Sequence, residues 1–244
     1  MKKLLAIVII LNLFSCSSEY EKLEDKVYYR FWSFGQGGWN EKVVENADLE
    51  SFTEIKSDDN LYGKDEFNVY YKNEIIPGAD PNTFRHLKSG YAIDKNRAYY
   101  FNDSIANSSP KKFAIIDGYY SKDWKNVFYT DKSLNICSLK DFTFVYEDEE
   151  SFLGRWSTDN CFYYYNNIKI PSDDYKNMVV FKGSSGIAKD KKYVYQEDRN
   201  IYFNKEGEKI LDTIDVETFT VIDNIRCKDK FGCINPYHGR DCNW

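Results

Sequence analysis

Similar short segments recur along the chain, and this repeat constrains the fold more than any other feature of the sequence. In each clear copy, an Asp is followed four residues later by an apolar residue that begins an aromatic-rich stretch. The clear copies cover residues 65–71, 94–100, 123–129 and 190–195, and the weaker ones cover 25–29 and 159–164. Self-similarity at a period of about 20–50 residues is typical of chains that stack one small structural unit on the next. We therefore predict a tandem-repeat protein.

A second landmark, Phe followed three residues later by Leu, Ile or Val, supports the repeat. It occurs at Phe52, Phe84, Phe113, Phe142 and Phe219, with Met178 as a variant. The interval from the apolar residue of the first landmark to this Phe is 15 residues in three copies, and 16 from Phe162 to Met178. It is 25 in two other copies, which predicts hairpins lengthened by about ten residues. One of these hairpins carries 35–38 and the other carries 204–207.

The residues within each copy favour β-structure. Residues 90–93 and 97–101 are rich in apolar and aromatic types and are joined by Asp-Lys-Asn, which predicts a hairpin. Residues 113–116 have the composition of a third strand. A short helix that opens at Asp80 and Pro81 is the competing interpretation, but the other copies favour a strand.

We therefore expect an all-β fold made of tandem β-meander repeats of about 30 residues each. Each copy is expected to have two or three strands, with about six to seven copies in the chain. The copies are expected either to stack as an open solenoid or to close into a propeller-like ring.

The copy that begins at Asp94 carries a family resemblance. Asp94-Lys95-Asn96, followed by Tyr99-Tyr100, resembles the signature of the DKNYY repeat family of bacterial exported proteins and lipoproteins. The resemblance covers roughly residues 25 to 233. It implies a repeat architecture and an exported location, and it carries over no catalytic residue.

The N-terminus has the features of a lipoprotein signal peptide. Two Lys precede an apolar run over 4–14, and the run ends in Leu-Phe-Ser-Cys at 13–16, which resembles a lipobox. We expect cleavage before Cys16 and lipidation of that residue, with an ordinary secretory signal as the alternative. Ser17, in place of Asp, favours the outer over the inner membrane of the bacterial cell envelope. Removing residues 1–15 changes the net charge from -6 to -8.

This reading gives the chain four segments. They are a signal peptide at 1–15, a lipidated Cys and tether at 16–24, DKNYY-like repeats at 25–223 and a Cys-containing terminal repeat or cap at 224–244.

Composition excludes several classes of function. The net charge of -6 and the lack of a basic cluster argue against a nucleic-acid partner. The only two His, His86 and His238, leave little material for a His-rich metal site. Aromatic residues make up 18% of the chain, which favours half-buried β-surface.

Five Cys follow Cys16, and export would permit disulfides among them. In the repeat register, Cys227 and Cys233 correspond to residues expected to face each other across a hairpin. We therefore predict a Cys227–Cys233 disulfide that closes the last repeat. The alternatives are free thiols and a zinc site formed by these two Cys with Cys242 and His238, but the spacings of the zinc site lack a close Cys-x-x-Cys pair.

The repeated Asp and Tyr residues have structural and functional interpretations. A periodic Asp at a turn is most simply a turn former, so we expect no catalytic carboxylate pair. Adjacent Tyr residues on a strand point to opposite faces, so one face is expected to carry a tyrosine ladder. The ladder either packs across strands or offers a weak binding face at Tyr70, Tyr99 and Tyr163, to which Trp32, Trp39 and Trp124 could add.

The function expected from these features is a non-enzymatic binding module with an unknown ligand. It would contact the membrane through its lipid and bind a glycan or an envelope protein. The alternatives are a carbohydrate-active enzyme and a purely structural envelope component. No catalytic residue, metal or other cofactor is expected.

Overall fold

The computed structural model describes residues 19–57, 61–146, 154–201, 203–205, 208–210, 214–224, 226–236 and 240. In these residues the regular structure is β-strand, apart from one short 3-10 helix, η1 (Tyr175–Asn177). The chain divides into two compact units, Met1–Pro110 and Lys111–Trp244. Among the described residues, no helix has the length and apolar character needed to cross a membrane.

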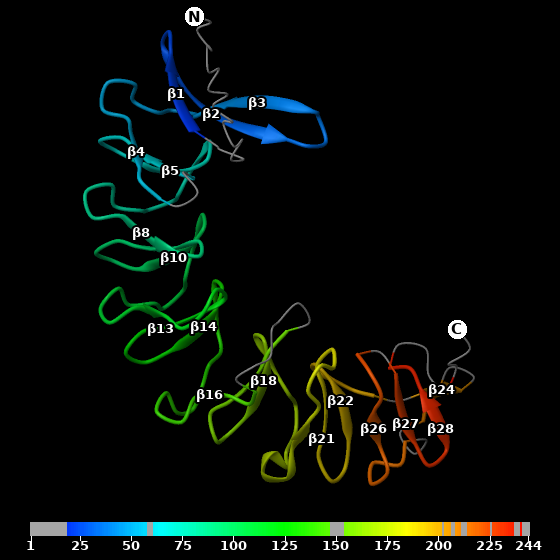
Figure 1. Ribbon diagram of the computed structural model, residues 1–244. Coiled ribbons are helices and arrows are strands. Elements are labelled where there is room, and N and C mark those ends of the chain that lie inside the picture. Colours follow the sequence, from blue (N-terminus) through cyan, green and yellow to red (C-terminus); the bar gives the residue numbers. More distant parts are fainter. Residues whose placement is uncertain are drawn as a thin grey trace, which may run out of the picture. The chain divides into compact units, whose positions relative to one another are not determined.

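The first unit is a series of antiparallel sheets, each built from strands that are consecutive in the chain (Figure 1). The first sheet has three strands and the next two have four each. The strands are β1 (Glu19–Leu23), β2 (Lys26–Ser33), β3 (Gly38–Val43), β4 (Thr53–Ile55), β5 (Tyr62–Lys64), β6 (Val69–Tyr71), β7 (Glu74–Ile75), β8 (Arg85–Lys88), β9 (Tyr91–Ile93), β10 (Ala98–Tyr100) and β11 (Asp103–Ser104).

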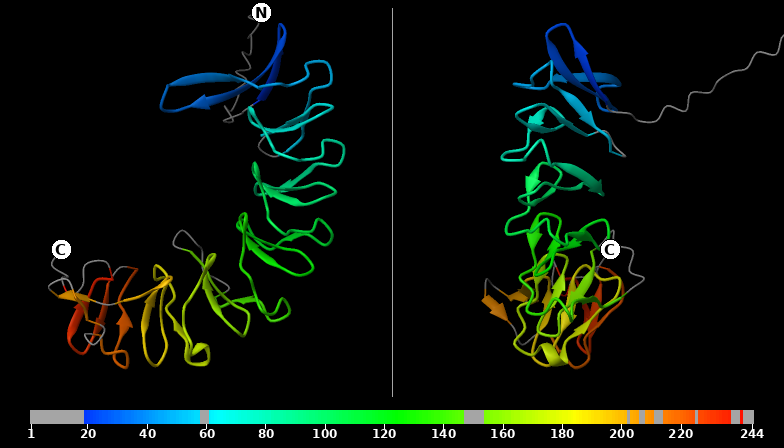
Figure 2. Two further views of the ribbon diagram at one scale, coloured as in Figure 1. Left: turned by 180° about the vertical axis from the view of Figure 1, so that it is seen from behind. Right: turned by 90° about the vertical axis from the view of Figure 1, so that its left-hand side faces the viewer.

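The second unit continues the same pattern, and Figure 2 shows its sheets from two further sides. Three four-stranded sheets are followed by a two-stranded hairpin and a three-stranded sheet. The strands are β12 (Ala114–Ile115), β13 (Tyr120–Lys122), β14 (Val127–Tyr129), β15 (Lys132–Ser133), β16 (Thr143–Phe144), β17 (Trp156–Thr158), β18 (Tyr163–Tyr165), β19 (Ile168–Lys169), β20 (Val179–Val180), β21 (Ile187–Lys189), β22 (Val194–Gln196), β23 (Arg199–Asn200), β24 (Phe203–Lys205), β25 (Glu208–Ile210), β26 (Thr220–Val221), β27 (Cys227–Asp229) and β28 (Gly232–Ile234).

The repeating unit is a four-stranded antiparallel meander. In one complete copy, β8 pairs with β9, β9 with β10, and β10 with β11. The strand that we expected to close a copy instead opens the next sheet: β12, which begins directly after Phe113, pairs with β13. The predicted all-β meander repeat is therefore confirmed, but a full copy has four strands and begins at the Phe landmark.

The fourth Asp copy follows the same register as the others. Its Asp159 N–H donates to the carbonyl of Phe162 at 3.3 Å, and the other copies have the same bond three residues apart. Tyr163 therefore takes the apolar position, and its interval to Met178 is 15 residues. The irregular interval of 16 was wrong because it placed Phe162, a turn residue, in the strand.

The two long intervals contain the extra hairpins that the sequence predicts. In the first unit, β2 and β3 pair continuously from Tyr28 opposite Val43 to Ser33 opposite Gly38. In the second unit, the added residues form the separate β24–β25 hairpin. Insertions are tolerated here because they lengthen a hairpin without changing the strands that stack on the neighbouring sheet.

The core lies between successive sheets. One buried cluster joins two sheets of the first unit and consists of Tyr62, Val69, Ile76, Phe84, Ala92 and Tyr99. The hydroxyl of Tyr62 donates to the carbonyls of Gly90 and Phe101, both at 3.2 Å, so polar bonds also cross this layer. A single meander is too small to bury its own apolar face, so each copy depends on its neighbours for stability.

In each four-stranded sheet, the turn between the third and fourth strands contains a residue in the left-handed conformation. These residues have φ between 52° and 56° and are Lys72, Phe101, Thr130, Asn166 and Glu197. The N–H of Phe101 donates to the carbonyl of Gly90 at 2.7 Å. Gly90 has φ of 76°, and a Cβ atom there would lie 2.6 Å from the Phe101 ring. Glycine is therefore required at residue 90 by both the backbone and the available space.

The start of the first sheet changes one expectation about the tether. The predicted signal peptide and Cys16 lie outside the described residues. However, β1 pairs with β2 from Glu19 opposite Arg30 to Leu23 opposite Lys26. The predicted polar tether is wrong for Glu19–Leu23, because these residues satisfy their backbone hydrogen bonds as a strand.

Candidate functional site

The repeated Asp begins the turn between the second and third strands of its sheet, and we call this turn the Asp turn. One carboxylate oxygen, Oδ1, accepts the backbone N–H groups two and three residues later. For Asp94 these donors are Asn96 at 2.7 Å and Arg97 at 2.9 Å. The same pair of bonds forms at Asp65, Asp123, Asp159 and Asp190. This geometry is the turn-forming role expected from the periodicity.

The second oxygen, Oδ2, joins the turn to other parts of its repeat. At Asp94 it accepts the N–H of Asp80 at 2.9 Å and the hydroxyl of Tyr99 at 2.7 Å. In three other copies the Tyr five residues after the Asp makes the same bond; these residues are Tyr70, Tyr164 and Tyr195. Four donors thus surround the buried Asp94 carboxylate, which leaves it no free acceptor for catalysis or for a metal ion.

These contacts set the charge states of the Asp–Tyr pairs. Burial alone would raise the pKa of Asp94, but hydrogen bonds from Tyr99 and from three backbone N–H groups outweigh it and hold the pKa below its usual range. Burial and the bond to Asp94 raise the pKa of Tyr99. The Asp is therefore ionised and the Tyr protonated at neutral pH, which suits a permanent hydrogen bond better than proton transfer.

The predicted tyrosine face lies mostly inside the protein. Tyr70 and Tyr99 are fully buried, and Tyr163 is half-buried against a core cluster. The proposed binding face is wrong at Tyr70 and Tyr99, because their hydroxyls are needed by the Asp turns. Tyr164, rather than Tyr163, is the structural equivalent of these two residues.

Side-chain contacts also join the Asp turn to the loop that precedes its sheet. Asp80 Oδ1 accepts the N–H and the hydroxyl of Thr83, at 3.0 and 2.7 Å. The Thr83 hydroxyl oxygen accepts the N–H of Lys95 at 3.1 Å, and the Lys95 ammonium lies 2.6 Å from Asp80. We call this arrangement the loop clasp. An equivalent loop clasp is formed in the last sheet by Asp215, Thr218 and Lys230.

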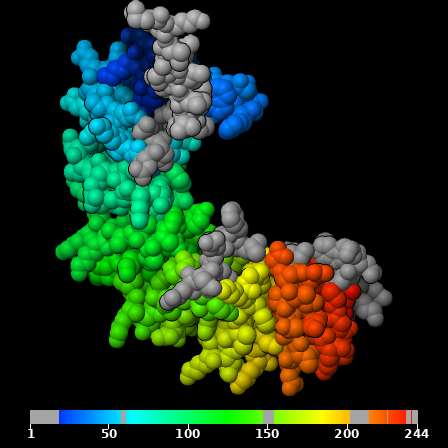
Figure 3. All heavy atoms as spheres, viewed as in Figure 1, coloured from blue at the N-terminus to red at the C-terminus, as the bar shows by residue number. Residues whose placement is uncertain are grey.

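Apart from Tyr119, which precedes β13, the exposed aromatic side chains of the described residues occupy two kinds of position. The first is the Asp turn itself, where Phe67, Trp124 and Phe231 are exposed by 67%, 59% and 62%. The second is the β2–β3 hairpin of the first unit, which carries Trp32, Phe34 and Trp39 and extends away from the neighbouring strands of that unit (Figure 3). The Trp32 and Trp39 rings meet edge to face, with centroids 6.0 Å apart.

Comparison with known proteins decides the family. The chain matches the model of the DKNYY family over residues 20–80 and 62–199, which together span well over half of its length. The chain belongs to the DKNYY family. No curated protein and no solved structure matches it.

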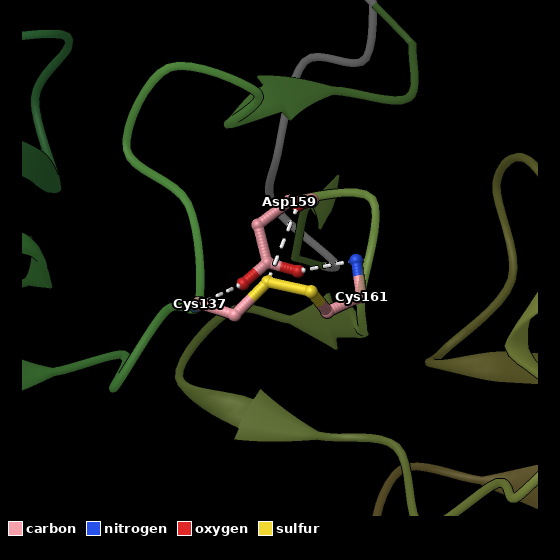
Figure 4. A group of neighbouring side chains, drawn as sticks. All are labelled: Cys137, Asp159 and Cys161. Carbon is pink, nitrogen blue, oxygen red and sulfur yellow. Dashed lines mark hydrogen bonds between the residues drawn. A yellow bond between two sulfur atoms is a disulfide. The ribbon is translucent and has the colours of Figure 1, made fainter.

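One DKNYY repeat replaces the loop clasp by a disulfide. Cys137 lies where Asp80 lies in its copy, and its N–H donates to Asp159 Oδ2 at 2.7 Å (Figure 4). Its sulfur is bonded to Cys161, which belongs to the Asp159 turn. These three residues are of metal-ligating types and lie close together. Their sulfurs bind each other, and the carboxylate accepts hydrogen bonds, so they form a covalent clasp.

The predicted Cys227–Cys233 disulfide is wrong. Cys227 is a free, buried thiol, and Cys233 takes part in a disulfide. Cys227 pairs with Ile234, and Cys233 pairs with Lys228. The two Cys are therefore offset by one position and point to opposite faces of the sheet.

The alternative zinc site loses the same two ligands. The Cys233 sulfur is already bonded, and burial in an apolar cluster raises the pKa of the Cys227 thiol to about 12. The remaining predicted ligands, Cys242 and His238, lie outside the described residues. A zinc site needs deprotonated thiolates, which this arrangement does not supply.

Sequence reasoning gave little weight to the β2–β3 hairpin. Trp32 and Trp39 were considered only as additions to a tyrosine face, and Phe34 was not considered. A usable signal was present, because residues 31–40 contain no charged residue although 30% of the chain is charged. A charge-free stretch at a lengthened hairpin predicts exposed apolar surface.

Proposed function

We propose that this protein is an exported, lipid-anchored module of the bacterial cell envelope that acts by binding and not by catalysis. The anchor is the lipid on Cys16, inferred from the Leu-Phe-Ser-Cys segment at 13–16. Its ligand class is a glycan or another envelope protein. The Ser at residue 17 favours the outer membrane.

One observation carries the binding proposal. The repeated Asp and Tyr side chains, which supply most of the chemistry in the motif, are used inside the scaffold as turn formers and hydrogen-bond partners. Three of the Asp turns also expose an aromatic ring, Phe67, Trp124 or Phe231, beside charged side chains such as Lys125 and Lys230. Aromatic faces suit stacking on sugars or packing against a protein. A repeat scaffold can present several such contacts along its length.

Fatty-acid labelling tests the anchor. Cells that express the wild type or Cys16→Ala are fed a clickable fatty acid, and the protein is then purified. We expect label on the wild type and none on the variant. A wild-type protein that carries no label would exclude the anchor.

Array binding tests the ligand class. The purified protein is screened on glycan and envelope-protein arrays, and the screen is repeated with Phe67→Ala and Trp124→Ala. Val179→Ala is the matched control, because Val179 is exposed but lies outside the turns. We expect each aromatic change to weaken binding several-fold and the control to have no effect. If the protein instead cleaves an arrayed glycan, and the cleavage is lost when two neighbouring carboxylates are changed, the protein is an enzyme and the binding proposal is wrong.

A further inference from the structure

The β2–β3 hairpin presents a surface that the repeats do not need. We use the name hairpin tip for residues 31–40. Three of its aromatic residues, Trp32, Phe34 and Trp39, are exposed by 39%, 86% and 42%. The tip has no charged side chain, whereas Arg30 and Glu41 lie directly below it and pair with each other across the strands. An uncharged aromatic tip above a charged base is the amphipathic pattern of a segment at a membrane–water interface.

The strand register places the chain's entry point beside this tip. β1 is antiparallel to β2, and Glu19, its first residue, lies opposite Arg30. The N-terminal end of β1 therefore lies at the same end of the sheet as the Trp32–Trp39 pair. Trp32 is only two residues beyond Arg30, about 7 Å along a strand.

The covalent reach of the chain brings the anchor close as well. Cys16 precedes Glu19 by three residues, which can span at most about 10 Å. We propose that the hairpin tip docks on the lipid bilayer that holds the Cys16 lipid, with Trp32, Phe34 and Trp39 in the headgroup region. This inference rests on the anchor of the proposed function. It gives the first sheet a second contact with the bilayer, and the apolar area that this contact buries adds to the membrane affinity.

The local charges agree with a membrane partner. Arg30 lies over the Trp39 ring at 5.8 Å and is paired with Glu21 at 2.6 Å and with Glu19 at 3.8 Å, so the charged side chains beside the tip contact each other. The acidic residues in the strands of the first sheet, Glu19, Glu21 and Glu41, lie on the base side of the tip. A bilayer can therefore meet the aromatic side chains before it meets a carboxylate.

Quenching by brominated lipids tests the docking. The full-length lipidated protein is reconstituted in vesicles of phosphatidylethanolamine and phosphatidylglycerol, with bromine at a shallow acyl position. We expect bromolipid to quench the wild-type tryptophan fluorescence, and the quenched fraction to be at least halved in a Trp32→Phe, Trp39→Phe double variant. Trp124→Phe is the control and should not lower the quenched fraction, because Trp124 belongs to an Asp turn and not to the hairpin tip.

The outcomes separate this inference from the anchor. The protein could float with vesicles and carry the normal fatty-acid label, while the double variant is quenched as strongly as the wild type. That result would overturn the docking and leave the anchor intact. Failure of the wild type to acquire lipid would remove the anchor, on which the docking depends. A photocrosslinker at residue 34 provides a second measurement. Crosslinks to phospholipid would support the docking, and crosslinks to a second copy or another protein would overturn it.

Discussion

Replacing Asp94 by Asn tests whether the repeated Asp acts as a fully occupied acceptor. The change keeps the shape of the side chain and removes its charge. Asp94 is 3% exposed, and its carboxylate accepts bonds from Asn96, Arg97, Asp80 and Tyr99 at 2.7–2.9 Å. The Asn amide nitrogen is a donor, so it would face at least one N–H that has lost its acceptor.

The expected cost follows from these bonds. A hydrogen bond to a charged group contributes about 1.5–3 kcal/mol. Asn keeps the two bonds at its oxygen, and Tyr99 can turn its hydroxyl to accept, which leaves the Asp80 N–H unsatisfied. We therefore expect Asp94→Asn to lower the free energy of unfolding by about 3 kcal/mol. Asp103→Asn, at an exposed position on β11, is the matched control and should change it by less than about 0.5 kcal/mol.

Urea unfolding followed by circular dichroism measures both variants, and its pH dependence gives an independent check. The folded-state pKa of Asp94 is depressed, so its stabilisation is present above the unfolded pKa of about 3.9. It is lost as the pH falls through the lower folded pKa, where the protonated Asp resembles Asn. The difference between wild type and variant should therefore be constant near neutral pH and shrink below about pH 4. A cost below about 1 kcal/mol at pH 7 would refute the reasoning.

The third Asp copy allows the converse experiment within the same prediction. Phe128 occupies the position of Tyr99 and is fully buried, but it has no hydroxyl to offer Asp123. At Asp65, Asp94 and Asp159 this hydroxyl shares Oδ2 with a backbone N–H, and at Asp190 it shares Oδ2 with the Ser172 hydroxyl. We expect Phe128→Tyr to stabilise the protein by about 1 kcal/mol, and Tyr99→Phe to destabilise it by a similar or larger amount. A destabilising Phe128→Tyr would show that this copy has no room for the hydroxyl.

Three further changes have defined outcomes. Gly90→Ala should lower the free energy of unfolding by more than about 1 kcal/mol, because of its positive φ and the close aromatic ring, whereas Gly35→Ala has open space and should cost little; urea unfolding measures both. Changing Cys137 and Cys161 together to Ser should cost about 3 kcal/mol for a loop of this length, and a reductant should destabilise the wild type more than the variant, which keeps only the disulfide of Cys233. Cys227, with its pKa raised to about 12, should resist alkylation at pH 8 in the native protein and react once urea unfolds it; rapid native labelling would contradict its burial.

The repeat could be predicted from the sequence because its landmarks recur at regular spacing. The Asp turn and the Phe landmark recur at fixed separation, and each corresponds to one fixed event in the fold: a hairpin turn and the start of a new sheet. The short strand that ends each meander, such as β11, was not expected. It is two residues long, and its residues, Asp103 and Ser104, have no strand preference. Its formation depends on pairing with β10, which composition does not reveal.

Errors at the level of single residues came from the register. The side chains of a strand alternate between faces, so an offset of one position exchanges core and surface. Cys227 and Cys233 were placed opposite each other, and the true partner of Cys227 is Ile234. The same sensitivity affected the tyrosine face, because the ring at the fifth residue after Asp is buried. The Cys137–Cys161 disulfide had no local signal, since its two residues are 24 positions apart and belong to different elements.

Different kinds of contact attach the loop before a sheet to the Asp turn of that sheet. In three sheets the loop before the sheet is tied to the Asp turn: by an ion pair and a Thr hydroxyl at Asp80, by a disulfide at Cys137, and by a Ser172 hydroxyl that donates to Asp190 at 2.6 Å. The chemistry differs but the two segments joined are the same. A four-stranded meander leaves this loop outside its strand pairing, so only such a link holds it where the next sheet begins. Since an ion pair, a disulfide and a neutral hydrogen bond join the same two segments in different repeats, we infer that the link matters more than the residue types that form it.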